Sequence, residues 1–239
     1  MNLILFEPHE LTAPLSRADR RAVHVLEVLR RAPGDTFEVG LLNGPHGRAT
    51  LLSSDDAALT LAFAWGAPPA QRAALTLIVG LPRPQTARDI LREATTLGAT
   101  ALHFVRTEKG EESYARSTLW SSGEWRRHVI TGAEQAFDTA IPTVAYGLSL
   151  AATLAPPAAP AARFAFDNYE SPAAFGECPL PRGTPLVLAF GAERGWAAAE
   201  RELLRGRGFT LAHLGARVLR TETAVIAALA IARAKLGLM

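Results

Sequence analysis

Two segments in the C-terminal part of the chain have the residue types and spacing of ligand-binding loops. In the first, an apolar run at 186–190 leads into the loop 191–195, which begins and ends with glycine, and a helix is expected from about Trp196. Ligands of α/β proteins bind beyond the carboxyl ends of strands, and glycines there let the backbone approach a flat ligand. An ordinary loop between a strand and a helix has the same spacing, so both interpretations stay open.

The second segment, residues 214–224, follows an expected strand and opens the last helix. Glu222 in the first turn of that helix suits the positive end of the helix dipole. A simple helix cap would account for this glutamate and its neighbouring threonines, but not for Arg217 and Arg220 just before them. The two arginines therefore favour a binding or catalytic role over a cap.

Motifs of several enzyme classes are missing from the sequence. It contains no GxxxxGK[ST] phosphate loop, no GxGxxG after a strand, no GxSxG elbow and no HExxH metal motif. The six histidines are scattered singly and Cys178 is the only cysteine. ATP hydrolysis, serine-hydrolase chemistry and a catalytic metal are therefore not predicted.

The composition is that of a globular protein with almost all of its basic charge on arginine. Of the 239 residues, 49% are apolar and 20% are charged, with 25 Lys and Arg against 23 Asp and Glu. Arginine suits planar, bidentate contact with phosphate. A formal net charge of +2 excludes a histone-like coating of nucleic acid, so such contact must come from a local patch. No signal peptide or membrane-length apolar run is recognisable, so a cytoplasmic location is expected.

Residues 1–67 are expected to form a small β-rich domain with one helix. The helix is expected to open after Ser16 and to run to about Arg31, with apolar residues on one side. The opposite, polar side of this helix could either bind RNA or simply face solvent, and both interpretations stay open. That side is expected to carry Arg17, Arg20, Arg21, His24 and Arg31.

Residues 72–239 alternate β-type and helical segments, which is typical of an α/β domain with a parallel sheet. The last helix is apolar all round from Ala224 to Ala232, which indicates burial either in the domain core or against a second subunit. Strands are expected at 74–80, 101–105, 163–166, 185–190 and 209–214, and helices at 86–97, 118–137, 197–205 and 221–236.

Three motifs together resemble the bacterial 16S ribosomal RNA uridine-N3 methyltransferases, members of the knotted SPOUT superfamily. Residues 214–224 are close to that family's LGxRILRxETA signature, the most specific match. Residues 190–195 followed by Glu200 look like its IGPEGGxxxxE loop, and residues 24–35 are similar to its HxxxVLR…GD pattern. Weaker similarity at 94–98 and 134–142 extends the resemblance along the chain.

The chain also departs from the family pattern. Two acidic residues stand where the family carries cations that are expected to face RNA, which leaves the exact RNA substrate open. The departures are Ala192 for proline, Arg194 for glycine, Thr96 for glutamate, Glu93 for lysine, Asp138 for arginine, and Leu3 and Ile4 for an N-terminal arginine.

The resemblance implies a PUA-like RNA-binding domain at 1–67, followed at 72–239 by a SPOUT methyltransferase domain with a parallel sheet and a C-terminal knot. It also implies an S-adenosylmethionine site without a metal, built from the backbone of the loops 190–195 and 214–219 and of a third loop at 167–169. The residues expected to bind this cofactor are Phe166, Phe190, Gly191, Glu193, Gly195, Leu214, Gly215, Val218, Leu219 and Thr223.

The reaction implied by the resemblance is methylation of N3 of a uridine in 16S ribosomal RNA or the small ribosomal subunit, by a homodimer. The N3 hydrogen is weakly acidic, so an arginine beside O2 or O4 would stabilise the anion. Arg220 is expected to fill this catalytic role, with Glu222 orienting it. RNA contacts are expected from Arg17, Arg21, His24, Arg30 and Arg217.

Two alternatives stay open. The chain could methylate another nucleotide or another RNA, as the departures at Glu93, Asp138 and Arg194 allow. It could also be a non-catalytic RNA-binding assembly factor whose cofactor site has decayed. The intact loop glycines and the intact segment 214–224 argue against decay, because a protein that only binds RNA has no need of them.

Overall fold

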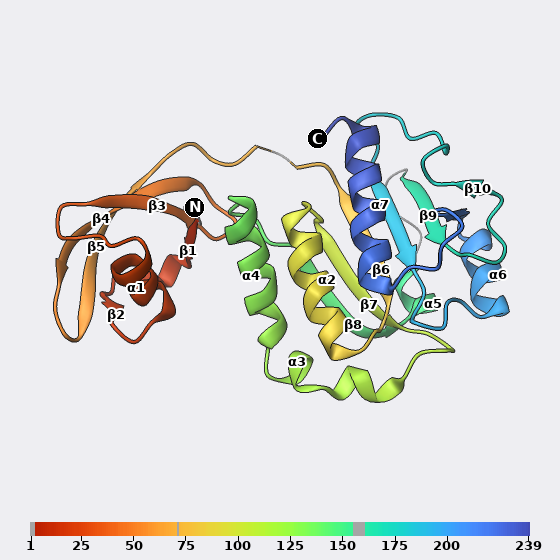
Figure 1. Cartoon of the computed structure of the whole chain (residues 1–239), viewed down its shortest axis with the longest axis horizontal. Helices are drawn as coiled ribbons and strands as arrows, with labels where there is room; N and C mark the ends of the chain where they lie inside the picture. Colours follow the sequence, from red (N-terminus) through yellow and green to blue (C-terminus); the bar gives the residue numbers. More distant parts are fainter. Residues whose placement is uncertain (1–2, 71, 155–160) are drawn as a thin grey trace. The chain divides into compact units, whose positions relative to one another are not determined.

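The computed structural model describes residues 3–70, 72–154 and 161–239. The chain divides into two compact units. Unit 1 comprises Met1–Gln71 and Ala133–Ile141, and unit 2 comprises Arg72–Gly132 and Pro142–Met239 (Figure 1). The segment Ala133–Ile141 lies inside the range expected for the second domain, so the chain passes between the units more than once.

Unit 1 is built on a five-stranded sheet with the order β1-β3-β4-β5-β2. β1 pairs with β3 in parallel, and the remaining pairings are antiparallel. Alternate apolar side chains, such as Phe37 and Val39 of β3 and Ala49 and Leu51 of β4, are buried together in the core of this unit. The strands are β1 (Ile4–Phe6), β2 (Leu15–Ser16), β3 (Thr36–Leu41), β4 (His46–Ser54) and β5 (Ala58–Trp65).

The helix expected from about 17 to 31 is shorter and irregular in the structure. α1 spans Arg20–Val23 and continues as a π-helical turn, η2, over His24–Val28. Arg30 then adopts a left-handed φ of 53°, which ends the helix. Because the π turn is wider than an α-helical turn, a 3.6-residue repeat places the following residues on the wrong face.

The segment Ala133–Ile141 is fixed in unit 1 by the turn between β3 and β4. Thr139 Oγ1 donates to the carbonyl of Gly44 at 2.6 Å, and the amide of Asn43 donates to the carbonyl of Thr139 at 2.8 Å. The side-chain oxygen of Asn43 accepts from the amide of Ile141 at 3.1 Å. These bonds satisfy backbone groups of both the turn and the segment.

Unit 2 contains a seven-stranded sheet with the order β10-β12-β9-β11-β6-β7-β8, and all of its pairings are parallel. This confirms the α/β class. The sequence did not predict β8 and β10, because both lie at the edges of the sheet, where a strand need not be apolar. The strands are β6 (Leu75–Gly80), β7 (Ala101–Arg106), β8 (Thr143–Ser149), β9 (Ala162–Phe166), β10 (Ala173–Ala174), β11 (Leu186–Phe190) and β12 (Thr210–His213).

The helix expected at 118–137 is broken at Gly123, which has a left-handed φ of 75°. α2 and α7 lie side by side against the sheet (Figure 1). α7 buries a stripe that includes Val225, Leu229 and Ala232, whereas Ile226 is 38% exposed, so the chain by itself does not bury this helix on every side. The helices are α2 (Pro84–Thr96), α3 (Thr118–Ser121), α4 (Glu124–Ala136), α5 (Leu150–Thr153), α6 (Ala198–Gly206) and α7 (Thr221–Leu236). Within the described ranges, no helix is long and apolar enough to cross a membrane.

Candidate functional site

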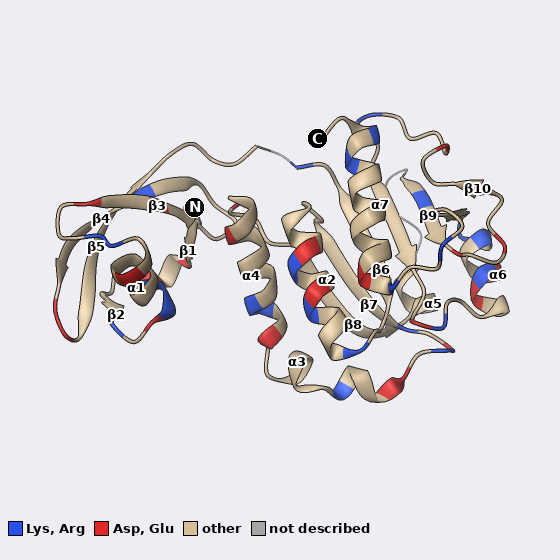
Figure 2. Cartoon of the chain, in the orientation of Figure 1, with Lys and Arg blue, Asp and Glu red and all other residues tan. Residues whose placement is uncertain are grey.

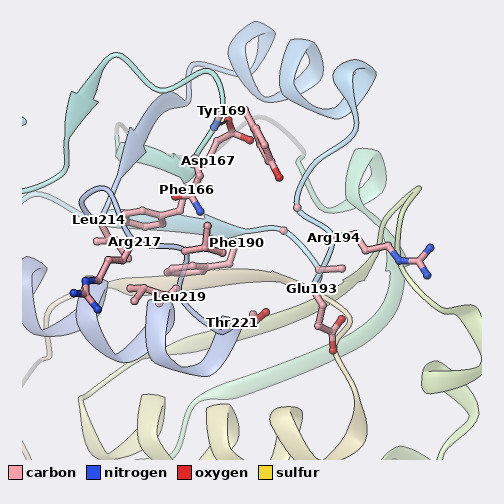
Figure 3. A pocket seen from close by; sticks show the side chains of 16 residues that line it. Phe166, Asp167, Tyr169, Phe190, Glu193, Arg194, Leu214, Arg217, Leu219 and Thr221 are labelled. Atoms are coloured by element: carbon pink, nitrogen blue, oxygen red, sulfur yellow. Dashed lines mark hydrogen bonds between the residues drawn. The ribbon is translucent and has the colours of Figure 1, made fainter.

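A pocket in unit 2 lies at the carboxyl ends of three neighbouring strands, β9, β11 and β12 (Figure 3). The segments that follow these strands form its walls, at 166–169, 190–195 and 214–221. The structure therefore brings together the two loops singled out by their spacing and the third loop expected from the resemblance. The lining residues are Phe166, Asp167, Asn168, Tyr169, Phe190, Gly191, Ala192, Glu193, Arg194, Gly195, Leu214, Arg217, Val218, Leu219, Thr221 and Ala224.

Glycines are required where the loop after β11 folds back on itself. A Cβ on Gly191 would lie 2.8 Å from the carbonyl carbon of Gly195, closer than real Cβ contacts allow. A Cβ on Gly80, at the end of β6, would lie 2.4 Å from the amide nitrogen of Ala192. Gly195 itself has a left-handed φ of 67°. Backbone rather than side chains therefore forms this wall of the pocket.

Apolar and aromatic side chains form the opposite part of the pocket. The rings of Phe166 and Phe190 are stacked, with centroids 4.7 Å apart and planes 16° from parallel. Leu214 and Leu219 point into the same region, and Val218 is 81% exposed in the described chain (Figure 3). This arrangement offers an apolar slot bounded by polar backbone, which suits a flat heteroaromatic ligand.

Two glutamates support the loop after β11 without pointing into the slot. Glu193 Oε1 accepts a hydrogen bond from the amide of Arg83 at 2.9 Å. Glu200 is buried, and its two carboxylate oxygens accept from the amides of Glu108 at 2.9 Å and of Ala197 at 2.8 Å. Glu193, expected to bind cofactor, thus fixes the loop to the segment before α2.

The third loop is held by a buried ion pair that the sequence did not reveal. Asp167 Oδ2 accepts from Nε of Arg201 at 2.8 Å, and the two side chains are 1% and 9% exposed. Asp167 Oδ1 accepts from the amides of Tyr169 and Glu170 at 2.8 Å and 2.7 Å. An aspartate directly after an expected strand was the available signal, but its partner lies on α6, which no local pattern connects to it.

Of the two residues expected to be catalytic, Arg220 lies at the end of the loop after β12 and Glu222 lies in the first turn of α7. Gly215 has a left-handed φ of 105°, and its amide donates to Nδ1 of His213 at 3.1 Å. Arg220 is exposed at the N-cap of α7, where its carbonyl accepts from the amide of Ala224 at 2.8 Å. No ion pair between Arg220 and Glu222 occurs among the described residues. Of the expected cofactor and catalytic residues, four are not among those lining the pocket, namely Gly215, Arg220, Glu222 and Thr223.

The basic residues expected to bind RNA in unit 1 are in different environments. Arg21 was expected on the exposed side of the helix, but its side chain is 15% exposed and pairs with Glu10 at 2.5 Å and Asp19 at 2.8 Å. These contacts raise the pKa of Arg21, chiefly through the Glu10 hydrogen bond, so its charge is neutralised within the unit. Arg17 donates to Ser54 Oγ at 3.1 Å and to the carbonyl of Asp55.

Two further members of that set remain, and one of them is exposed. His24 is partly buried, and its Nε2 has no hydrogen-bond partner among the described residues. Arg30 is exposed at the end of η2. Arg217, from the loop after β12, is exposed and lines the pocket of unit 2. Figure 2 shows how the arginines and lysines are interspersed with acidic residues along the chain.

Several departures from the family pattern have local partners. Glu93 accepts from Arg92 Nε at 2.8 Å, so its charge is balanced by a neighbour on α2. Thr96 Oγ1 donates to the carbonyl of Gly132 at 3.1 Å and joins α2 to α4. Asp138 Oδ1 accepts from the amide of Ala140 at 3.0 Å. No group of three His, Cys, Asp or Glu side chains positioned to hold a metal occurs in the described part of the chain.

Comparison with known proteins gives consistent matches along the chain. Residues 69–233 match the family model described as an RNA methyltransferase domain. The chain is 34% identical over 240 residues to the ribosomal RNA small subunit methyltransferase E of Treponema pallidum (strain Nichols), covering 97% of this chain and 90% of that protein. A Borreliella burgdorferi relative, named ribosomal RNA small subunit methyltransferase E 1, is 26% identical over 99% of both chains.

Solved structures share the fold over nearly the whole chain. A probable rRNA-methyltransferase from Porphyromonas gingivalis superposes with a TM-score of 0.83 at 19% identity, covering 98% of this chain and 99% of that one. The ribosomal RNA small subunit methyltransferase E of Neisseria gonorrhoeae, solved bound to S-adenosyl methionine, gives a TM-score of 0.74 at 24% identity, covering 97% of both chains.

Proposed function

The chain belongs to the RNA methyltransferase family, and from that premise we propose that it methylates 16S ribosomal RNA of the small subunit with S-adenosylmethionine as methyl donor. The observation that carries the proposal is the similarity to the Treponema relative over 97% of this chain. The pocket at the ends of β9, β11 and β12 supplies a site in the same chain for the donor.

The residues of the pocket fit S-adenosylmethionine. Gly191 and Gly195 both line the pocket and carry no side chain, so a ligand can approach the backbone of this loop, whose amides and carbonyls can read the edge of an adenine. Leu214, Val218 and Leu219 can pack against its faces. When bound, this cofactor supplies an electrophilic methyl group, and the chain contributes alignment of donor and acceptor, which is worth several kcal/mol of the barrier, up to about 10.

We further propose that the acceptor is N3 of a uridine. That nitrogen is hidden in base pairs and carries a weakly acidic hydrogen, so the base must be exposed, at a cost of a few kcal/mol. The uracil anion that forms on loss of the hydrogen needs a cation beside O2 or O4. Arg220 is exposed next to the pocket wall at the N-terminus of α7, whose helix dipole adds to the positive potential.

Glu222 is proposed as a positioning residue for Arg220. It lies in the first turn of α7, two residues after Arg220, and is partly buried. The two side chains are not ion-paired in the described chain. We propose that they pair when bound RNA draws Arg220 over the pocket. No side chain on the pocket wall is assigned as the base that removes the N3 hydrogen.

Unit 1 is proposed to be the PUA-like domain that contacts RNA backbone, through Arg17, Arg30 and the partly buried His24. Arg21 is left out of this set because Glu10 and Asp19 hold its guanidinium. Substituting Arg17 with alanine should reduce the salt dependence of RNA binding by about one log unit per log unit of salt for each phosphate that the variant no longer neutralises.

Three further points complete the proposal. We propose a knot at the C-terminus, a homodimer that covers the exposed side of α7, and a cytoplasmic location. The proposed dimer rests on the apolar run 224–232 of α7, in which Ile226 is 38% exposed in the described chain. Sedimentation of the purified chain would test this part.

Mass spectrometry of nucleosides from 16S ribosomal RNA tests the function. Ribosomal RNA from cells lacking the gene should lack 3-methyluridine, and the purified protein with S-adenosylmethionine should restore it on isolated small subunits. Loss of a different methylated nucleoside would show another target. An unchanged profile together with a defect in subunit assembly would indicate a non-catalytic role.

A further inference from the structure

Tyr169 has an unusual environment for an exposed aromatic residue. Its side chain is at the rim of the pocket and the residue is 79% exposed. The position is nevertheless fixed, because its amide donates to the buried carboxylate of Asp167 at 2.8 Å. Asp167 is in turn held by Arg201 of α6. A large apolar ring is therefore presented to solvent by a buried anchor.

The two faces of this ring differ. The guanidinium carbon of Arg201 lies over the ring, 5.5 Å from its centroid. Arg201 is itself 9% exposed in its side chain and fixed by Asp167, so it remains on that side. The high exposure of Tyr169 thus comes from its other face and its edge. A cation behind an aromatic ring does not prevent a planar group from stacking in front of it.

The ring is separate from the apolar slot. Phe190, Leu214 and Leu219 gather on one side of the pocket, while Tyr169 lies on another, across from the loop that contains Glu193 (Figure 3). A Cβ on Gly195 would lie 4.0 Å from the tyrosine Cε2, so this glycine leaves the side of the ring that it faces free of a side chain of its own. A planar group bound in the slot would therefore leave the ring of Tyr169 available.

We propose that the open face of Tyr169 stacks on the extruded target base of the RNA. This inference rests on the proposed function, because it assumes that an RNA base enters next to the methyl donor. Stacking of a base on an aromatic side chain contributes about 1–3 kcal/mol, which offsets much of the cost of removing the base from its own stack. The hydroxyl group is not needed for stacking.

The first test compares Tyr169→Ala and Tyr169→Phe with wild type, and with Tyr114→Ala as a tyrosine variant outside the pocket lining. The kcat/KM of Tyr169→Ala for RNA should fall by about tenfold or more, as loss of stacking predicts. Tyr169→Phe and Tyr114→Ala should stay within about threefold of wild type. Calorimetry should give the same S-adenosylmethionine affinity for all four proteins.

The results that would overturn the proposal are specific. Weaker S-adenosylmethionine binding by Tyr169→Ala would mean that the ring packs on the cofactor. An unchanged kcat/KM in that variant, or an equal loss in Tyr169→Phe, would exclude stacking. A wild-type protein that binds the cofactor but methylates no ribosomal RNA would instead refute the proposed function.

A second test does not depend on turnover. 16S ribosomal RNA containing 5-bromouridine, free or assembled into small subunits, is irradiated with the protein, because this base cross-links to aromatic residues stacked on it. Mass spectrometry should locate a cross-link at Tyr169 that is absent from Tyr169→Ala. Cross-links confined to other residues would overturn the proposal even if methylation were normal.

Discussion

The carboxylate of Glu200 accepts a hydrogen bond from the backbone amide of Glu108, 92 residues earlier in the chain. The same carboxylate caps its own helix through the amide of Ala197. One buried side chain thus joins the loop after β7 to the start of α6. Nearby, Lys109 Nζ donates to the carbonyl of Trp196 at 2.9 Å and strengthens the same junction.

Glu200→Ala should lower the free energy of unfolding by about 2–4 kcal/mol, because two buried amides lose a charged acceptor. Glu200→Gln keeps one acceptor oxygen and should lose less. Urea denaturation measures both values. Glu202→Ala is the matched control on the exposed side of α6 and should change stability by less than about 0.5 kcal/mol. If Glu200→Ala changed the free energy of unfolding as little as Glu202→Ala, the junction would not contribute to stability.

Arg201→Ala should destabilise the protein by about 3–5 kcal/mol, since it leaves the Asp167 carboxylate buried without its cation. The loop that carries Tyr169 would lose its anchor at the same time. Limited proteolysis after residues 168–170, followed by mass spectrometry, should detect faster cleavage in this variant. A variant as stable and protease-resistant as wild type would show that the amide hydrogen bonds of Asp167 suffice.

Gly191→Ala should weaken S-adenosylmethionine binding by at least about tenfold, because the new Cβ would push the loop away from Gly195. Calorimetry measures the affinity. Gly206→Ala is a suitable control, as a Cβ there meets no atom within 4 Å and the glycine does not have a positive φ. If Gly191→Ala bound the cofactor normally, the loop would not be the binding wall.

Arg220→Ala should bind S-adenosylmethionine with nearly wild-type affinity while turnover falls by about 10²–10³-fold, the usual loss for a group that stabilises developing negative charge. Single-turnover methylation and calorimetry on the same preparation separate the two effects. Should binding fall together with activity, Arg220 would be a residue of the cofactor site or of the fold.

Acid stability should depend on Glu124. Hydrogen bonds from Arg88 and His128 lower the pKa of this carboxyl group from 4.5 to about 2. Because the folded pKa lies below the unfolded one, the stabilisation is complete above pH 4.5 and is lost as the pH falls toward 2. Glu124→Gln should therefore show a smaller decrease in urea midpoint between pH 6 and pH 2.5 than wild type. Identical pH profiles would contradict the assignment.

The sequence predicted the parts of the fold that depend on local patterns. Runs of apolar residues, loop glycines and a helix-start signal were enough to predict the apolar strand before Gly191 and the helix that begins at Thr221. The prediction of a regular helix that reaches Arg31 was wrong, because nothing in a 3.6-residue repeat signals the π turn at His24–Val28. Arg21, which precedes that turn, was misplaced for another reason, because its partners Glu10 and Asp19 hold its side chain within the unit.

Long-range partners could not be predicted. Asp167 and Arg201 are 34 residues apart, and Glu200 and Glu108 are 92 residues apart, so neither pair forms a local motif. Gly191 and Gly195 are close in the sequence, but they approach each other only because the loop folds back on itself. The loop sequence is compatible with other conformations that do not fold back. The sequence therefore indicated which loops form the site, while the groups that hold those loops emerged only from the structure.

The placement of Ala133–Ile141 in unit 1 has a consequence for how this protein can be divided. A fragment that ends near Gln71 lacks the residues that bond to Asn43 and Gly44, and a fragment that begins at Arg72 carries those residues without their partners. Exchange of either unit between related genes by a single crossover would therefore separate the turn between β3 and β4 from the segment that hydrogen-bonds to it. Recombination that preserves both units must move two pieces of coding sequence together.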